Sequence, residues 1–282
     1  MKLRAFDRLI KSQATSDGAG VRLKRTLGQT PFSRLDPFLM LDEFRSDDAE
    51  DYIAGFPAHP HRGFETVTYM LAGRMRHEDH LGNRGLIEGG GVQWMTAARG
   101  IIHAEMPEQE SGLMHGFQLW LNLPAREKMK DPAWRDIPAA EVPVSTSGDV
   151  SVTVIAGEYG DVQGAVSGAS TEPLYLDVRL APAATFDLPL ADARNACAYC
   201  YLGELRNSSD DGHPRLTEGT LGIFGKGTDI SVQAGEQGAS FLLLAARPLN
   251  EPVVQYGPFV MNTQEEIEQA MDDYRTGRLG RD

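Results

Sequence analysis

The chain repeats part of its own sequence, and this repeat constrains the fold more than any other feature. When the 282-residue sequence is compared with itself at an offset of 130 residues, residues 69–89 and 199–219 are identical at seven of 21 ungapped positions. That is about five times the number expected by chance for an ordinary composition. The repeat predicts two copies of one structural unit. The identical pairs are Tyr69/Tyr199, Gly73/Gly203, Arg76/Arg206, Gly82/Gly212, Leu86/Leu216, Glu88/Glu218 and Gly89/Gly219.

Short apolar runs separated by glycine and proline indicate that the repeated unit is made of β-strands. The chain has 30 glycines and 16 prolines, and the runs between them are rich in Val, Ile, Leu and aromatic residues. This pattern is typical of many short strands joined by turns. Strands are expected at residues 65–71, 117–121, 151–155, 174–180, 198–202 and 240–245.

One segment near the end of the chain has helical periodicity instead. A helix is expected over residues 263–276, because Thr263 and Glu266 form a capping-box pattern and Gly277 stands where a C-terminal glycine belongs. Its expected apolar face consists of Ile267, Ala270, Met271 and Tyr274. A linker at residues 125–143 then divides the chain into a first domain, 1–140, and a second domain, 141–282, which ends in this helix.

Charge and apolar content exclude some classes of protein. The net charge of -13 argues against direct binding of nucleic acid, because a phosphate backbone attracts basic surfaces. The sequence has no apolar run of 18 residues and its first residues lack a signal-peptide pattern, so a cytoplasmic protein without a membrane span is expected. Cys197 and Cys200 have no second cysteine pair with which to complete a zinc site and are interpreted as ordinary buried strand residues.

The histidines are concentrated in the first copy of the repeat. Six of the seven lie between positions 59 and 115. His59 with His61, and His103 with Glu105, are pairs two residues apart, so each pair faces one side of a strand. Three imidazoles and one carboxylate suit a first-row divalent metal, namely iron, manganese, cobalt, nickel, copper or zinc. At the 130-residue offset the second copy has Pro189, Ala191, Gln233 and Gly235 at these positions, so it is expected to hold no metal.

Further polar and bulky residues near these pairs have more than one interpretation. Glu65 would share a face with His61 if the strand ran on, and could then supply the carboxylate in place of Glu105. The segment 77–80, which begins with His77, is either an exposed loop or a proton relay at the pocket mouth. Gln118 could bind a ligand or lie at the edge of the core. Phe56 and Met95 are candidates to line an apolar cleft.

Several segments closely resemble the pirins of the cupin superfamily. They are PFLMLDEF (37–44), GFPAHPHRGFETVTY (55–69), HEDHLGN (77–83), QWMTAARGIIHAEMP (93–107), HGFQLWLNLP (115–124) and VQYGPFVMNTQEEI (254–267). The resemblance implies a bicupin with two antiparallel jelly-roll barrels face to face and one mononuclear Fe²⁺ in the first barrel. It places the metal ligands at His59, His61, His103 and Glu105, and it leaves Glu65 with a supporting or purely structural role.

The resemblance also implies two alternative functions. Some bacterial pirins are quercetin 2,3-dioxygenases, which would make this chain an enzyme that cleaves a flavonol with O₂, releases a depside and carbon monoxide, and uses Glu105 as the base. Other pirins are iron-dependent regulators, so the metal could instead be a redox sensor in a protein that acts through a transcription factor or a metabolic enzyme. A purely structural metal is a third interpretation.

Overall fold

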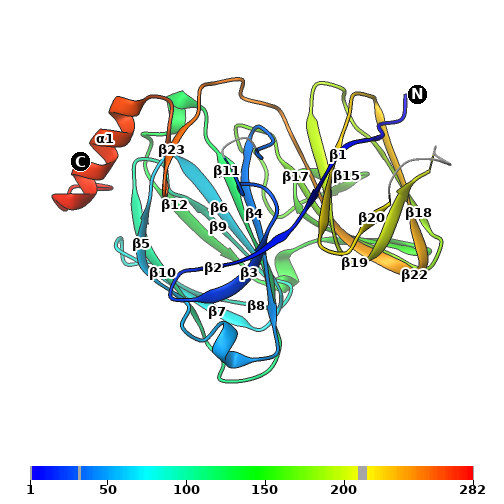
Figure 1. The fold of residues 1–282 in the computed structure, drawn as a ribbon, viewed down its shortest axis with the longest axis horizontal. Helices are drawn as coiled ribbons and strands as arrows, with labels where there is room; N and C mark the ends of the chain where they lie inside the picture. Colours follow the sequence, from blue (N-terminus) through cyan, green and yellow to red (C-terminus); the bar gives the residue numbers. More distant parts are fainter. Residues whose placement is uncertain (1, 31–32, 209–214, 282) are drawn as a thin grey trace. The chain divides into compact units, whose positions relative to one another are not determined.

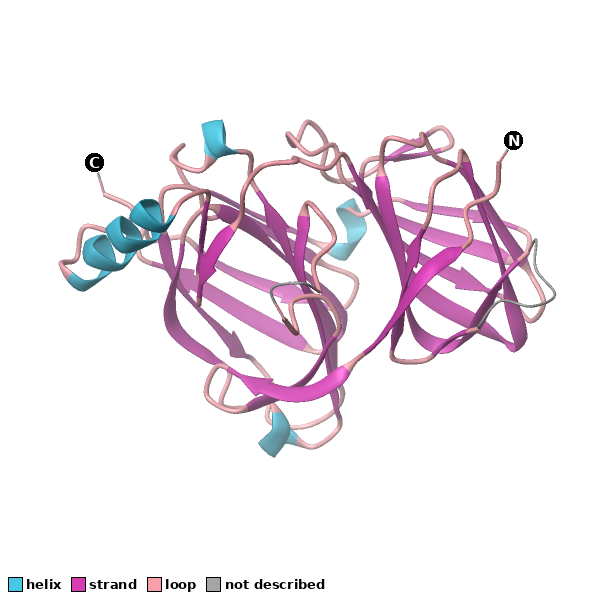
Figure 2. Ribbon diagram, turned by 45° about the horizontal axis from the view of Figure 1, so that its top comes forward, coloured by secondary structure: helices cyan, strands magenta, loops and turns pink. Residues whose placement is uncertain are grey.

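The computed structural model describes residues 2–30, 33–208 and 215–281. Nearly all of the regular structure is β-strand, with one α-helix near the C-terminus (Figures 1 and 2). This confirms the prediction of a mainly β protein. Within the described ranges, no helix is both long enough and apolar enough to span a membrane.

The chain forms two compact units, and each unit combines two stretches of sequence. Residues 14–141 and 249–282 form one unit, which we call the histidine unit. Residues 1–13 and 142–248 form the other, which we call the apolar unit. The chain passes from the histidine unit to the apolar unit after residue 141, next to the domain boundary expected from the sequence. The two terminal segments lie in the opposite units from those expected.

Specific contacts explain why each terminal segment belongs to the unit that is distant from it in sequence. The first strand, β1 (Phe6–Lys11), pairs along β21 (Thr220–Phe224) of the apolar unit. At the other end of the chain, Val260 packs with Leu39 and Phe64 of the histidine unit. A linear division of the sequence does not anticipate either contact, because both partners are far away along the chain.

Two sheets build the histidine unit. The larger has the strand order β12-β9-β6-β11-β4-β3-β2 and the smaller β5-β10-β7-β8, and a separate hairpin pairs β23 with β24. The bounds are β2 Gln13–Asp17, β3 Val21–Arg25, β4 Phe38–Ser46, β5 Phe56–His61, β6 Phe64–Ala72, β7 Arg74–Asp79, β8 Arg84–Glu88, β9 Val92–Thr96, β10 Ile101–Pro107, β11 Met114–Asn122, β12 Ala133–Ile137, β23 Val254–Tyr256 and β24 Phe259–Met261.

One nine-stranded sheet builds most of the apolar unit. Its path is β1-β21-β19-β22-β17-β14-β13, with β18 paired to β22 and β20 paired to β19, and β15 pairs with β16 separately. The bounds are β1 Phe6–Lys11, β13 Val144–Ser147, β14 Val150–Ala156, β15 Glu158–Tyr159, β16 Val162–Gln163, β17 Leu174–Leu180, β18 Thr185–Pro189, β19 Asn195–Asn207, β20 Leu216–Thr217, β21 Thr220–Phe224 and β22 Asp229–Ala246.

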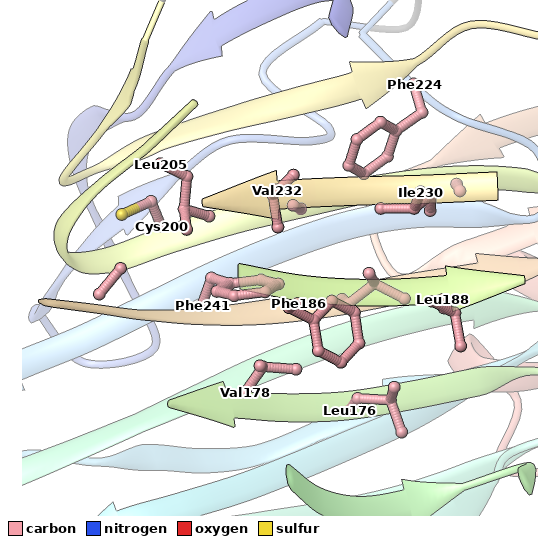
Figure 3. Close-up of a cluster of buried hydrophobic side chains, with 14 of the residues drawn as sticks. Leu176, Val178, Phe186, Leu188, Cys200, Leu205, Phe224, Ile230, Val232 and Phe241 are labelled. Atoms are coloured by element: carbon pink, nitrogen blue, oxygen red, sulfur yellow. The ribbon is translucent and has the colours of Figure 1, made fainter. Parts of the chain in front are cut away.

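Apolar side chains fill the core of this second unit. Phe186, Phe241 and Leu176 lie at its centre, each at most 1% exposed (Figure 3). Cys200 belongs to the same cluster, and both cysteines are buried thiols on a strand, as predicted. Burial raises the pKa of the Cys197 thiol, which makes it unreactive.

Two of the identical pairs lie in matching environments in the two units, whereas Leu86 is 47% exposed and Leu216 is fully buried. Tyr69 on β6 and Tyr199 on β19 are each 1% exposed. Gly73 directly follows β6 and Gly203 lies at a register shift within β19, and both have positive φ angles, 88° and 75°, a conformation that favours glycine. Gly212 lies outside the described residues.

The predicted linker is more structured than its sequence indicates. Two short 3-10 turns occupy Ala125–Glu127 and Ala139–Glu141, and a third lies at Ala49–Asp51. Between the first two, β12 pairs with β9 and becomes an edge strand of the large sheet. The linker therefore contributes a strand to the histidine unit.

The C-terminal helix α1, Gln264–Arg275, confirms the helix prediction. Thr263 caps it, the capping box with Glu266 is present, and Gly277 has the expected positive φ of 73°. Its apolar face is narrower than predicted: Ile267 and Ala270 are buried. Met271 and Tyr274 are 40% and 42% exposed, because the helix packs on a short hairpin that covers only part of its surface.

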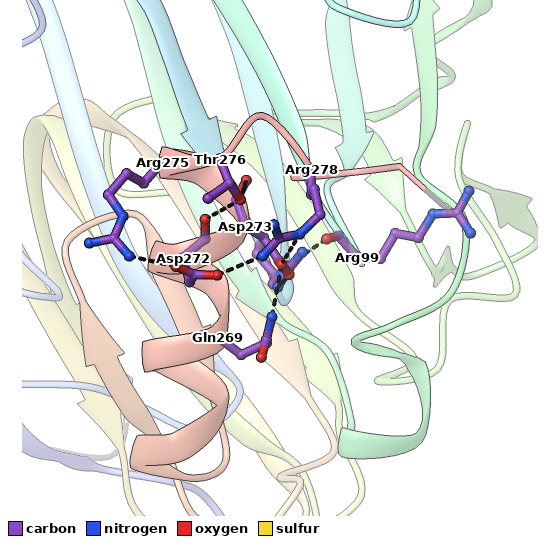
Figure 4. Close-up of polar contacts among 8 residues, drawn as sticks. Arg99, Gln269, Asp272, Asp273, Arg275, Thr276 and Arg278 are labelled. Carbon is purple, nitrogen blue, oxygen red and sulfur yellow. Dashed lines mark hydrogen bonds and ion pairs between the residues drawn. The ribbon is translucent and has the colours of Figure 1, made fainter.

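An ion-pair cluster fastens the end of this helix to the histidine unit. Arg62 follows His61 directly, is almost fully buried, and donates from Nη1 to Asp273 at 2.9 Å and from Nε to the Arg99 carbonyl at 2.6 Å. Asp272 accepts from Arg275 and Arg278 at the surface (Figure 4). The helix is therefore tied to the residue beside a candidate metal ligand.

The N-terminal segment is held to the apolar unit by one buried arginine, and its removal should destabilise that unit. The Arg4 guanidinium donates to the carbonyls of Gly227, Arg194 and Ala191 at 2.7–3.0 Å. Arg4→Met leaves these acceptors unsatisfied, so we expect a loss of about 3 kcal/mol in the free energy of unfolding. Chemical denaturation measures this loss. Arg8→Met, an exposed change on the same segment, should alter stability by less than about 0.5 kcal/mol, and equal effects of the two variants would contradict the expectation.

Candidate metal centre

Antiparallel pairing of β5 and β10 brings three histidines together in the histidine unit. His59 lies directly opposite His103, and His61 lies two residues along β5 on the same face. The ring centroids are 4.4–5.0 Å apart. One nitrogen from each ring lies within 4.8 Å of the other two, which makes this the group suited to a metal ion among the described residues.

The hydrogen-bonding state of the rings fits a metal. His59 Nδ1 lies 2.9 Å from the Pro57 carbonyl oxygen and donates to it, which leaves Nε2 available. His103 Nε2 is buried and has no hydrogen-bond partner among the described residues. Neither ring nitrogen of His61 makes a hydrogen bond of ordinary geometry there, although the Pro258 carbonyl lies close by. Buried nitrogens without partners are costly, and a bound cation would satisfy them.

Electrostatics keep these imidazoles in the form that binds metals. Burial, reinforced by the neighbouring histidines, holds the pKa of His61 and of His103 well below the usual range. Both rings are therefore neutral at physiological pH and offer a lone pair. Imidazole nitrogen ligands of this kind suit a first-row divalent metal.

Glu105 follows on the same face of β10, but its carboxylate has protein partners. The Thr68 hydroxyl lies 3.0 Å from Oε1, and Gln118 donates from Nε2 to Oε2 at 3.2 Å. Thr68 also contacts the Gln118 amide oxygen, so its single proton serves one of two acceptors. The three histidines form the close ligand group without the carboxylate, which lies on a wall of the same cavity.

A cavity of about 590 Å³ opens in front of His59, His61 and Glu105. This volume is in the usual range for a small-molecule site. The Trp120 ring packs against His61 at a centroid distance of 5.2 Å. The predictions that Phe56 lies at the cleft and that Gln118 faces it agree with the lining. The other apolar lining side chains are Leu23, Leu39, Met40, Phe44, Trp120, Pro57 and Pro258.

Charged residues line another part of this cavity. Arg25 donates to both oxygens of Asp42, at 2.8 and 2.7 Å, and to Asp17 at 2.9 Å. Burial raises the pKa of Asp42 to about 6, although the Arg25 guanidinium acts against the rise. The pair is therefore ionised at neutral pH. Direct cross-strand pairing places Asp42 beside Gln118, so polar groups extend from Arg25 toward Glu105.

His77 lies behind the histidine group and not in an exposed loop. It is on β7, fully buried, with its Nδ1 3.3 Å from Nδ1 of His103 and its Nε2 3.3 Å from Oδ2 of Asp79. Trp134 stacks on its ring at 5.3 Å. Of the two interpretations of this segment, the exposed loop is wrong for His77.

The structure places Glu65 and Met95 away from the cavity. The strand does not run on from His61: β5 ends there and the chain turns at Gly63, where φ is 92°. Phe64 and Thr68 on β6 face the site, so Glu65 faces the other side, where it accepts from Thr96 at 2.6 Å. Burial raises the pKa of Glu65.

Met95 is fully buried in a small cluster with Ala97 and Ile101, against which Trp134 packs. It is a core residue and not part of the cavity lining.

Three residues of the site were not singled out from the sequence. Thr68 and Trp120 reach it from neighbouring strands of the large sheet, and Asp42 from a third. The sequence indicates which face of its own strand each of these side chains occupies. It does not indicate the register between strands, which brings them to Glu105 and His61.

Comparison with known proteins identifies the family. The model of the Pirin family matches residues 20–121, and that of the Pirin C-terminal cupin domain matches residues 175–280. This chain belongs to the pirin family. The first match lies within the histidine unit, which holds the three histidines, whereas the second covers much of the apolar unit and continues into the C-terminal segment of the histidine unit.

Relatives from distant organisms align over nearly the whole pirin chain. A Pseudomonas aeruginosa protein named "Putative quercetin 2,3-dioxygenase" is 54% identical, with 94% of each chain covered. Human Pirin is 41% identical over 96% of this chain and 92% of its own length. The crystal structure of a quercetin 2,3-dioxygenase from Acinetobacter baumannii superposes with a TM-score of 0.89 at 31% identity, covering 99% of both chains.

Proposed function

We propose that this pirin binds one divalent metal, Fe²⁺ in the first instance, and cleaves a flavonol with O₂ as a quercetin 2,3-dioxygenase does. The observation that carries the proposal is the grouping of three imidazoles, two of them buried and held neutral, beside a carboxylate at a largely apolar cavity. Similarity to proteins named for this activity supports the choice of substrate class.

The proposed metal ligands come from two neighbouring strands. His59, His61 and His103 would hold the metal, with Glu105 as fourth ligand, and manganese, cobalt, nickel, copper or zinc could take the place of iron on ligand type. When bound, the metal would act as a Lewis acid that favours the deprotonated form of a chelating hydroxyl group.

Glu105 is the proposed base. A flavonol must lose its 3-hydroxyl proton before its ring reacts with oxygen, and Glu105 is the carboxylate on the cavity wall beside the histidines. Thr68 and Gln118 orient it through hydrogen bonds to its two oxygens. Phe56 and Trp120 would pack against the flat rings and keep water away. The reaction consumes one O₂ and yields the depside and carbon monoxide.

Replacing Glu105 with glutamine tests this assignment. Glu105→Gln keeps the size of the side chain and removes the base, so we expect kcat to fall by about 10²-fold or more. Wild type and variant are freed of metal, reloaded with each divalent metal in turn, and mixed with quercetin in air. Loss of flavonol absorbance and O₂ uptake measure turnover, and bound metal is measured on the same samples to separate lost chemistry from lost metal.

The same assay separates the proposed functions. If the wild-type protein, fully loaded with each metal in turn, consumes no flavonol, the dioxygenase proposal is overturned. That result would favour the regulatory alternative, in which a protein partner binds the ferrous and ferric forms with different affinities. Equal binding of a partner to both forms would count against the regulator.

A further inference from the structure

Three residues form a buried chain that leads away from the cavity. His103 Nδ1 lies 3.3 Å from His77 Nδ1, and His77 Nε2 lies 3.3 Å from Asp79 Oδ2. His77 and the Asp79 side chain are 0% exposed, and His103 is 1% exposed. Water therefore does not compete for these contacts, and each polar atom depends on its neighbour in the chain.

Tautomer chemistry allows one direction of hydrogen bonding along this chain when His103 serves as a ligand. A neutral imidazole has one N–H and one lone pair. The buried, unpartnered Nε2 of His103 must present its lone pair, so Nδ1 carries the proton and donates it to His77. His77 Nδ1 then accepts, and its own proton is on Nε2, directed at the Asp79 carboxylate.

The end of the chain is fixed by the turn that follows β7. Oδ1 of Asp79 accepts from the backbone N–H groups of Leu81 and Asn83 at 3.0 Å each, and Oδ2 accepts from the Asn83 side chain at 2.8 Å. Trp134 lies parallel to the His77 ring, with an interplanar angle of 21°, and restricts its rotation. Both members behind His103 are therefore preoriented before a ligand arrives.

We propose that His77 and Asp79 are positioning residues for the metal: they lock His103 in the tautomer and ring orientation that binds it and increase the basicity of Nε2. His59 contrasts with this, because its ring donates to the Pro57 backbone carbonyl and lies near the surface. His103 is thus the one of the three whose basicity is set by a carboxylate through a second ring. The inference rests on the metal site proposed above, but it is independent of the substrate.

The direct test is to measure the metal affinity of single-residue variants of the full chain. His77→Phe keeps a ring to stack on Trp134 but removes the acceptor, and we expect the Kd for Zn²⁺ and Fe²⁺, measured by chelator competition, to rise about 10–100-fold. His77→Gln restores an acceptor oxygen and should recover most of the affinity. His115→Gln, which changes a buried histidine on β11 that hydrogen-bonds to Glu43 and does not line the cavity, is the matched control and should bind as wild type does.

A spectroscopic measurement separates positioning from general damage to the fold. In the zinc-loaded wild type, ring ¹⁵N NMR should show His103 bound through Nε2 with a slowly exchanging proton on Nδ1, and His77→Phe should lose that protection. Asp79→Asn supplies a second variant if His77→Phe does not fold, with an expected loss of several-fold in affinity. If the affinities of the folded variants equal that of wild type, the positioning role is overturned, whereas failure of wild type to bind any metal would instead overturn the metal site.

Discussion

His61→Leu is expected to abolish metal binding while it makes the metal-free protein more stable. His61 is 2% exposed, and neither of its ring nitrogens has a well-formed hydrogen bond, so the metal-free fold buries two poorly satisfied polar atoms. Leucine fills much of the same space against Phe64 and Trp120 without that cost. We expect the free energy of unfolding to rise by about 1–3 kcal/mol and the metal affinity to fall by more than about 100-fold.

His115→Leu gives the matched control, with the opposite expected effect on stability and no expected effect on metal binding. His115 is also buried, but its Nε2 hydrogen-bonds to Glu43 at 3.0 Å and it does not line the cavity. Its replacement should destabilise the protein and leave the metal stoichiometry unchanged. Calorimetric titration with metal and thermal unfolding of both metal-free variants measure the two effects. Wild-type metal affinity in His61→Leu would show that His61 is not a ligand.

Lys128→Met should cause a large loss of stability in the histidine unit. Lys128 is 1% exposed, and its ammonium donates to the Gly63 carbonyl at 2.7 Å, Asn122 Oδ1 at 2.6 Å and the Val260 carbonyl at 3.0 Å. Burial lowers the pKa of Lys128 to about 8, so the group is still largely charged at neutral pH. Methionine leaves three buried acceptors unsatisfied, and we expect a loss of about 3–5 kcal/mol.

This loss corresponds to a fall of roughly 6–20 °C in Tm for a unit of this size. Lys130→Met is the control, because Lys130 makes a surface ion pair with Glu127 and its loss should cost less than about 1 kcal/mol. Scanning calorimetry distinguishes the two. A Lys128→Met protein as stable as the Lys130→Met protein would contradict the assignment of Lys128 as the cross-link between the Gly63 turn and the C-terminal segment.

The parts of the fold that were predictable from the sequence are those encoded locally. The side chains of Thr263 and Glu266 accept from each other's backbone N–H at the start of the helix, Gly277 adopts a positive φ after its end, and the glycine and proline spacing defines the strands. Pairing between distant segments leaves no such local mark. The exchange of residues 1–13 and 249–282 between units and the addition of β12 to the large sheet were therefore not predictable.

The same distinction applies to the site. His59 with His61 and His103 with Glu105 could be found because alternation along a strand is a local property. Glu65 would share a face with His61 only if the strand ran on, but the turn at Gly63 resets the alternation, and sequence spacing does not reveal such a reset. The contact between His77 and His103 depends on the register of β7 against β10, which pairs His77 with Glu105 and His103 with Asp79.

Because residues 249–282 complete the histidine unit, the order in which the chain is synthesised affects how this unit folds. When residues 14–141 have emerged from the ribosome, all three histidines are present. Val260 and Asp273, which contact Lys128 and Arg62 near the turn at Gly63, have not yet been made, because they lie about 120 residues or more beyond residue 141. The nascent histidine unit must therefore wait, incomplete, while the whole of the intervening apolar unit emerges. A protease cut between the two family domains would likewise yield no pair of fragments that each contain a complete unit.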